Sequence, residues 1–219
     1  MRIAIDIDNT LVDYRRIVIE TIMNIRPDSR DLVSKMKRKD IVDIKKLIKI
    51  KYSDEIWQEV QGHIYSHRGD PITFYPYASQ AIKRLAEKGL EIYIVSHRSK
   101  YGLKSAEKIN ILRVSQERIF NWIKDSNCSE SIKSVIFCDT YQEKIKTLSF
   151  ISPSTIVDDL YQVHNDHLQN NAEQKNRTFN ILFGNSLPSV HKSNKYMELI
   201  SCNDWKIILE LLIDYYGLR

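Results

Sequence analysis

Two pairs of aspartates are the residues of this sequence with the clearest chemical potential. Asp6 and Asp8 are separated by one residue, and Asp158 and Asp159 are adjacent. Carboxylates this close together disfavour joint ionisation unless a cation or hydrogen-bond donors offset their charge. Mg²⁺ prefers oxygen ligands and would supply that positive charge. If the two pairs meet in the fold, they could therefore hold one magnesium ion.

Other polar residues could complete a site for phosphoryl transfer. Thr10 and Ser96 offer hydroxyl donors, and Lys144 offers a fixed positive charge. Phosphoryl transfer requires positioning of the transferred group and neutralisation of its charge. One carboxylate can act as the nucleophile and form an acyl phosphate, while a second protonates the leaving oxygen and then activates water. The residue types thus fit this reaction.

Most of these residues follow segments that we expect to be strands. Short apolar runs predict strands, and amphipathic runs predict the helices between them. The predicted strands are residues 2–7, 90–95, 134–138, 155–157 and 179–183. The predicted helices are residues 79–88, 103–124 with a break near Val114 and Ser115, 144–150, and a last helix that Asn203 caps and that ends at Tyr216. This alternation predicts a mostly parallel sheet covered on both faces, with ligands at the carboxyl ends of its strands.

Residues 13–72 have a different pattern. Their apolar residues recur at helical spacing, with little indication of strands. We therefore expect two domains, which are an α/β core formed by residues 1–12 and 73–219 and a small helical domain formed by residues 13–72.

Four segments resemble, in the same order along the chain, the four motifs of the haloacid dehalogenase-like (HAD) superfamily. The segment Ile-Asp-Ile-Asp-Asn-Thr-Leu at 5–11 resembles the first motif, D-x-D-x-T. Residues 93–96 resemble the second, a strand that ends in Ser or Thr, and residues 143–145 resemble the third, a lysine on a helix. Residues 156–160 resemble the fourth, an acidic pair. Four motifs in order form a more specific signal than the first motif alone.

This resemblance implies a Rossmann-like, HAD-like α/β fold with a helical cap at residues 13–72. Asp6 would be the nucleophile, and Asp8 would be the general acid and base. Mg²⁺ would be held by the Asp6 side chain, the Asp8 backbone carbonyl, and one or both of Asp158 and Asp159. The residues expected to bind the substrate phosphate or to support the loop around it are Thr10, Ser96, His97 and Lys144.

Two assignments stay open at this point. Lys146 lies two positions from Lys144 and could be the lysine of the third motif, although the Glu-Lys-Ile context favours Lys144. His164 and His167 have the spacing of two metal ligands on one helical face, but no third ligand is evident.

The predicted function is that of a magnesium-dependent phosphatase for a small phosphomonoester of the nucleotide or sugar-phosphate type. A phosphotransferase is also compatible, whereas a C–Cl dehalogenase would not need Asp8 as a second carboxylate. One alternative is a non-catalytic or regulatory HAD-like binding module, which the costly retained carboxylates disfavour. Another is a nucleic-acid-end phosphatase, which the basic stretch from Arg30 to Lys51 would suit.

The bulk properties predict a cytoplasmic protein that makes no membrane contact. The 219 residues carry a net charge of +5, and no apolar run approaches the ~20 residues of a membrane helix. The first residues do not resemble a secretory signal. Three cysteines without C-x-x-C spacing favour a reducing compartment. No nucleic-acid-binding motif accompanies the basic stretch, so we expect a small phosphorylated metabolite as the partner.

Overall fold

The computed structural model describes residues 1–36, 39–66, 72–98, 100, 110–170, 178–184 and 199–218. The chain forms two compact units. Residues 1–12, 74–98 and 120–219 form the first, which we call the sheet unit. Residues 13–73 and 99–119 form the second, which we call the helical unit.

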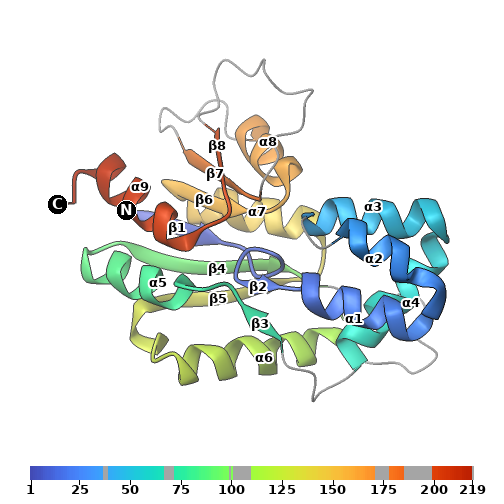
Figure 1. The fold of residues 1–219 in the computed structure, drawn as a ribbon. Coiled ribbons are helices and arrows are strands. Elements are labelled where there is room, and N and C mark those ends of the chain that lie inside the picture. Colours follow the sequence, from blue (N-terminus) through green and yellow to red (C-terminus); the bar gives the residue numbers. More distant parts are fainter. Residues whose placement is uncertain are drawn as a thin grey trace. The chain divides into compact units, whose positions relative to one another are not determined.

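A parallel sheet is the framework of the sheet unit. Its strands are β1 (Arg2–Ile5), β4 (Glu91–His97), β5 (Ile132–Cys138), β6 (Thr155–Asp158), β7 (Phe179–Phe183) and β8 (Leu199–Cys202). They lie in the order β5-β4-β1-β6-β7-β8, and every neighbouring pair is parallel (Figure 1). Ile5 of β1 pairs with Ile94 of β4 and with Val157 of β6. The carboxyl ends of three adjacent strands therefore meet at one edge, directly after Ile5.

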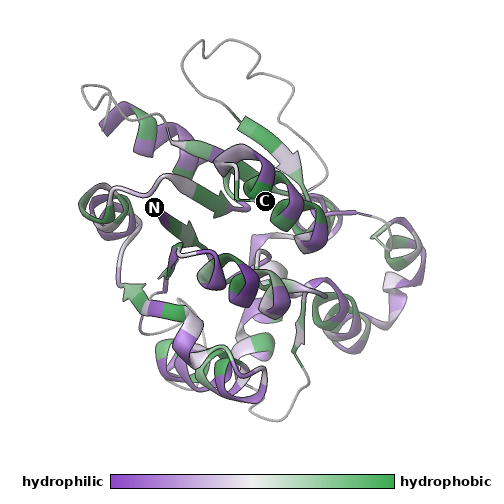
Figure 2. Ribbon diagram, turned by 90° about the vertical axis from the view of Figure 1, so that its left-hand side faces the viewer, coloured by the Kyte–Doolittle hydropathy of each residue, from purple (hydrophilic) through white to green (hydrophobic). Residues whose placement is uncertain are grey.

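The central strands are apolar over their length, as is typical of a parallel sheet buried on both faces. Ile3, Ala4 and Ile5 are buried, and so is every residue of β7. Colouring by hydropathy shows mainly hydrophobic residues on the strands of the sheet, and hydrophobic and polar residues together on the helices (Figure 2). The sheet thus supplies a rigid base for the loops that follow its strands.

Helices cover the two faces of this sheet. The helices of the sheet unit are α5 (Ala78–Glu87), α7 (Tyr141–Ile151), α8 (Tyr161–Asn170), α9 (Trp205–Tyr216) and the short 3₁₀ helix Ser129–Ser131. α7 packs on β4 and β5 and beside α8, and their apolar residues form one core with Ala4, Val95 and Ile156. Because successive side chains alternate across a strand, Ile3 and Ile5 face the opposite side, where α5 and α9 pack together (Figure 1).

The helical unit has a core of its own. Its elements are α1 (Arg15–Ile25), the 3₁₀ helix Pro27–Ser29, α2 (Arg30–Met36), α3 (Ile41–Lys51) and α4 (Asp54–Ser66). Fully buried Ile22, Met36, Ile44, Ile48 and Val60 lie on the inward faces of these helices. β2 (Val12–Asp13) pairs with β3 (Thr73–Phe74) where the chain passes between the units, and α6 (Ile111–Asp125) has residues in both.

The predicted α/β class with a parallel, Rossmann-like sheet is confirmed, but two local predictions were wrong and one strand of the sheet was missed. α6 is not broken near Val114 and Ser115, because both residues are buried within one continuous helix. The last helix is capped by Asp204 rather than Asn203, since the Asp204 carboxylate accepts a hydrogen bond from the Lys206 amide at 2.7 Å. Strand β8 was not predicted at all. Within the described ranges, no helix combines the length and the apolar character of a membrane span.

Candidate active site at the carboxyl edge of the sheet

Asp6 is the first residue after β1, and the sheet fixes its position. Its backbone N–H donates to the carbonyl of Val157 in β6 at 2.9 Å. The chain then turns tightly, because the amides of Leu11 and Val12 both donate to the carbonyl of Ile7 at 2.9 Å. Asn9 has a positive φ of 55° in this turn, a conformation that asparagine tolerates better than most residues. The turn keeps residues 6–10 together at the strand end.

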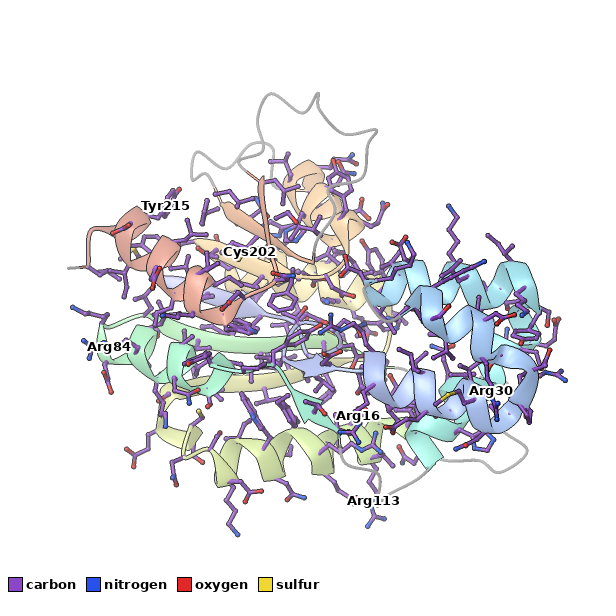
Figure 3. The ribbon with its side chains drawn as sticks, in the orientation of Figure 1. Arg16, Arg30, Arg84, Arg113, Cys202 and Tyr215 are labelled. Carbon is purple, nitrogen blue, oxygen red and sulfur yellow. The ribbon has the colours of Figure 1, made fainter. Side chains whose placement is uncertain are left out.

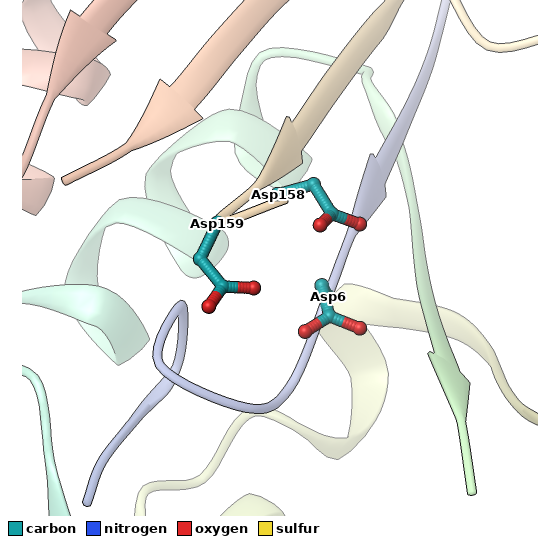
Figure 4. Close-up of side chains that lie close together, drawn as sticks. All are labelled: Asp6, Asp158 and Asp159. Carbon is teal, nitrogen blue, oxygen red and sulfur yellow. The ribbon is translucent and has the colours of Figure 1, made fainter. Parts of the chain in front are cut away.

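The carboxylates of Asp6, Asp158 and Asp159 come together at this edge. Each offers an oxygen, and these oxygens all lie within 4.8 Å of one another (Figure 4). Asp158 is further held by the Leu160 amide, which donates to its Oδ1 at 2.9 Å. Asn9 Nδ2 donates to Asp159 Oδ2 at 3.2 Å. Three oxygen donors in this arrangement suit a hard cation such as Mg²⁺.

Lys144 bridges two of the three carboxylates. Its Nζ lies 2.7 Å from Asp6 Oδ1 and 2.7 Å from Asp158 Oδ2, and its side chain is 4% exposed. The start of α7 is fixed by a capping box, in which Thr140 Oγ1 accepts from the Glu143 amide at 3.1 Å and the Glu143 carboxylate accepts from the Thr140 amide. Lys146 is exposed on the same helix. The structure therefore brings Lys144, not Lys146, to the cluster.

Burial and mutual repulsion raise the proton affinity of this cluster. Burial, together with Asp158 and Asp8, raises the pKa of Asp6 from 3.8 to about 7, although Lys144 opposes the shift. Burial and the charges of Asp158 and Asp6 also raise the pKa of Asp159. Burial by itself would lower the pKa of Lys144, but Asp158 and Asp6 outweigh it and raise that pKa. The site thus has a surplus of negative charge that favours a bound proton or cation.

Asp8 is paired with an arginine that the sequence reasoning missed. Nη2 of Arg98 donates to Asp8 Oδ2. Four carboxylates, those of the two aspartate pairs, carry −4 when ionised, and Lys144 and Arg98 contribute +2. The remaining charge of −2 matches one divalent cation. Arg98 follows Ser96 by two residues. Its position so close to a predicted strand end was the one feature of the sequence that could have marked it as a candidate site residue.

Three buried oxygens beside the cluster have no hydrogen-bond partner among the described residues. They are Asp8 Oδ1, Asn9 Oδ1 and Thr10 Oγ1. Thr10 is otherwise held in place, because its carbonyl accepts a hydrogen bond from Trp205 Nε1 at 2.8 Å. Buried polar atoms are almost always paired, so three unsatisfied oxygens in one loop are consistent with a ligand or water at this position.

The other predicted site residues lie at the end of β4 and in α8. Ser96 is buried within β4, and His97 is exposed as its last residue. Partial burial, Lys144 and Arg98 lower the pKa of His97. His164 is buried, with Nδ1 3.0 Å from Asn180 Oδ1 and Nε2 3.2 Å from the Asp158 carbonyl. These contacts give His164 a supporting place behind Asp158 rather than a place among the clustered carboxylates.

Comparisons with known proteins place this fold. No family model matches the sequence, and no curated protein matches it. Solved structures do match over nearly the whole chain. A HAD-superfamily hydrolase from Ehrlichia chaffeensis is 14% identical, with a TM-score of 0.52 and coverage of 98% of this chain and 97% of that one.

Two further matching structures were solved with bound ions. A HAD-family hydrolase from Deinococcus radiodurans with bound phosphate and sodium is 9% identical, with a TM-score of 0.58 and coverage of 99% and 96% of the two chains. A magnesium-bound protein from Bacillus subtilis, assigned to the HAD hydrolases, is 11% identical, with a TM-score of 0.56 and coverage of 96% and 97%. The chain therefore has the fold of the HAD-superfamily hydrolases, as its four motifs predicted.

Proposed function

We propose that this protein is a HAD-superfamily phosphatase that hydrolyses a small phosphomonoester through an aspartyl phosphate on Asp6. The observation that carries the proposal is the meeting of Asp6, Lys144 and Asp158 within hydrogen-bond distance at the carboxyl edge of the sheet. These residues come from three distant segments, and each matches a different HAD motif. The phosphate-bound and magnesium-bound structural neighbours support the same reading.

Two carboxylates divide the chemistry. An oxygen of Asp6 attacks the phosphorus, the bond to the leaving oxygen breaks, and Asp8 transfers its proton to that oxygen. Asp8 then takes a proton from water as the water oxygen attacks the phosphorus. The bond between Asp6 and phosphorus breaks, and inorganic phosphate leaves with Asp6 restored.

The other residues bind and neutralise the phosphoryl group. Lys144 stabilises negative charge beside Asp6, while Ser96, Thr10 and His97 offer donors near the strand ends. The Asp6 carboxylate, the Asp8 backbone carbonyl and one or both of Asp158 and Asp159 would hold Mg²⁺, which would supply positive charge to the transferring group. The residual charge of the cluster and its unsatisfied oxygens fit such an ion.

The proposal also covers the class of substrate, the role of the helical unit and the cellular location of the protein. We infer a small phosphorylated metabolite of the nucleotide or sugar-phosphate type, with the helical unit acting as a cap. Within the basic stretch, Lys49 pairs with Asp54, and Lys45 and Lys51 lie over the rings of Trp57 and Tyr52. These contacts within the unit favour a structural use of the lysines over a nucleic-acid surface. The three cysteines are free, which supports a cytoplasmic setting.

The test is phosphate release from an aryl phosphate and from a panel of metabolite phosphates, with Mg²⁺ or with EDTA. Wild type should release phosphate only with the metal, and Asp6→Asn should be inactive. Asp125→Asn is the matched control, because Asp125 is exposed at the end of α6. Metal-bound wild type that releases no phosphate from any compound would favour the binding-module alternative.

A further inference from the structure

Arg98 is a buried cation beside Asp8, and the proposed mechanism gives it no role. Its backbone N–H donates to the carbonyl of Cys138 at 2.8 Å, one residue after the paired ends of β4 and β5. Because this bond continues the ladder between the two strands, the sheet sets the position of Arg98. The sheet therefore holds the backbone of Arg98, and its side chain is buried, with 8% exposed.

The ion pair between Arg98 and Asp8 competes with the proposed role of Asp8 as general acid and base. While Asp8 Oδ2 accepts a hydrogen bond from Arg98, that oxygen is directed to the guanidinium rather than to a leaving oxygen. Asp8 can therefore use that oxygen as a general acid only after it turns away from Arg98.

The geometry makes Asp8 the partner that can move. Its side chain is 23% exposed, whereas that of Arg98 is 8% exposed. Its second oxygen, Oδ1, has no hydrogen-bond partner among the described residues. The link to Arg98 is thus the one hydrogen bond of the Asp8 carboxylate among those residues, and a competing anion would need to replace that link alone.

Arginine suits a phosphoryl group at least as well as a carboxylate. Its planar guanidinium stays charged and can donate two parallel hydrogen bonds to a phosphate. A phosphoryl dianion carries more charge and more acceptor oxygens than one carboxylate. If a substrate phosphoryl group occupies the edge beside Asp6, it can therefore compete with Asp8 for Arg98.

We propose that Arg98 binds the phosphoryl group of the substrate, and that Asp8 occupies Arg98 only until the phosphoryl group displaces it. Substrate binding then releases the Asp8 carboxyl group for proton transfer to the leaving oxygen. Binding of the phosphoryl group by Arg98 and release of the Asp8 carboxyl group would therefore occur in the same step. This inference rests on the proposed function, because it takes the substrate to be a phosphomonoester.

The test is equilibrium binding of inorganic phosphate in the presence of Mg²⁺, measured by calorimetry without turnover. Arg98→Ala should weaken binding by roughly tenfold to a hundredfold, as expected for loss of a hydrogen bond between charged groups. Asp8→Asn should tighten binding, since it removes the competitor. In the Arg98→Ala, Asp8→Asn double variant that gain should disappear, because there is no guanidinium left to compete for.

Controls separate this exchange from general effects of charge and folding. Arg84→Ala should bind phosphate like wild type, because Arg84 pairs with Glu87 on the outer surface of α5 (Figure 3). Arg98→Lys keeps the positive charge but loses the planar guanidinium that can donate two parallel hydrogen bonds. It should therefore bind phosphate several-fold more weakly than wild type. This variant replaces Arg98→Ala in the test if the alanine variant does not fold.

Three results would overturn the exchange. These are unchanged phosphate affinity in both Arg98 variants, an equal gain from Asp8→Asn with and without Arg98, and a wild type that does not bind phosphate. If wild type is active but the Arg98 variants bind phosphate as tightly as wild type does, only the proposed exchange is overturned. A wild type that binds phosphate through Arg98 but hydrolyses no ester would overturn only the proposed activity.

Discussion

Lys144 Nζ lies 2.7 Å from Asp6 Oδ1, although 138 residues separate the two in the chain. The contact joins the start of α7 to the end of β1, and it is buried. Removing one partner of such a pair leaves an uncompensated charge, which is far costlier than removing an exposed charge. This pair is therefore both part of the proposed site and a point on which the fold depends.

Replacing Lys144 by methionine should reduce both stability and activity. We expect metal-free Lys144→Met to lose about 3–5 kcal/mol of unfolding free energy, the usual cost of breaking a buried ion pair. Mg²⁺ should restore part of that loss by neutralising Asp6 and Asp158. Urea denaturation with and without Mg²⁺ measures both effects.

Lys146→Met is the matched control for this change, because Lys146 is exposed two residues along the same helix. It should stay within about 0.5 kcal/mol of wild type. Equal stability of the two variants would contradict the role of Lys144.

The stability of the metal-free protein should fall as pH rises through neutrality. The pKa of Asp6 is raised from 3.8 to about 7, so the folded state holds a proton there that the unfolded state has already lost. The stabilisation from this group is fully present below 3.8 and is lost as pH rises through about 7. Melting temperatures of wild type between about pH 5 and about pH 9, in EDTA, measure this loss.

Two comparisons test the assignment to Asp6. Asp6→Asn should show a shallower decline over the same pH range, since its amide does not titrate. Mg²⁺ should also flatten the wild-type profile, because the cation replaces the proton. A decline of the same slope in wild type and Asp6→Asn would assign the titration to another group.

Asn9 should influence magnesium affinity through Asp159. Its amide donates to Asp159 Oδ2 at 3.2 Å, and loss of a hydrogen bond that orients a metal ligand costs about 10–100-fold in metal affinity. Asn9→Gly tolerates the positive φ of this position, so it should weaken Mg²⁺ binding without straining the turn. Magnesium titration of the melting temperature reports the affinity.

Asn9→Ala provides the comparison, since it loses the same hydrogen bond and also strains the backbone at a φ of 55°. It should match Asn9→Gly in magnesium affinity but be less stable without metal. Wild-type magnesium affinity in both variants would exclude this role for Asn9.

The capping box of α7 should contribute to stability through Thr140. Thr140→Ala removes the oxygen that accepts from the Glu143 amide, and we expect a loss of about 1 kcal/mol. Thr140→Ser keeps that oxygen and should remain close to wild type. Chemical denaturation measures the unfolding free energy of the two variants. An equal loss of unfolding free energy in both would mean that the hydrogen bond to the Glu143 amide does not provide this stability.

The sheet and the ends of its strands could be predicted because their signals are local. An apolar run followed by aspartates marks a buried strand with polar residues at its carboxyl end, and this holds at Asp6 and at Asp158. Strand β8 was missed because Leu-Ile-Ser-Cys is short and its residues are only partly buried. The break predicted near Val114 failed because Ser115 lies within the buried face of a long helix.

The pairings within the site could not be predicted, because they depend on contacts between distant segments. Lys144 and Lys146 point in different directions from a helix, and only the resemblance of the Glu-Lys-Ile segment to the third motif favoured Lys144, because the helical pattern does not say which direction faces the sheet. The Arg98–Asp8 pair joins residues 90 positions apart, and nothing local marks Arg98 as buried. His164 behind Asp158 and Asn9 beside Asp159 are likewise visible only in the folded chain.

Trapping the phosphoryl group on the protein tests directly whether Asp6 is the nucleophile. Wild type is mixed with an aryl phosphate and Mg²⁺, quenched in acid within the first turnovers, and analysed by peptide mass spectrometry. We expect the added mass of one phosphoryl group on the peptide that contains Asp6, and no such mass in Asp6→Asn. Rapid hydrolysis by wild type with no phosphorylated peptide, or with the group on another residue, would contradict nucleophilic catalysis by Asp6.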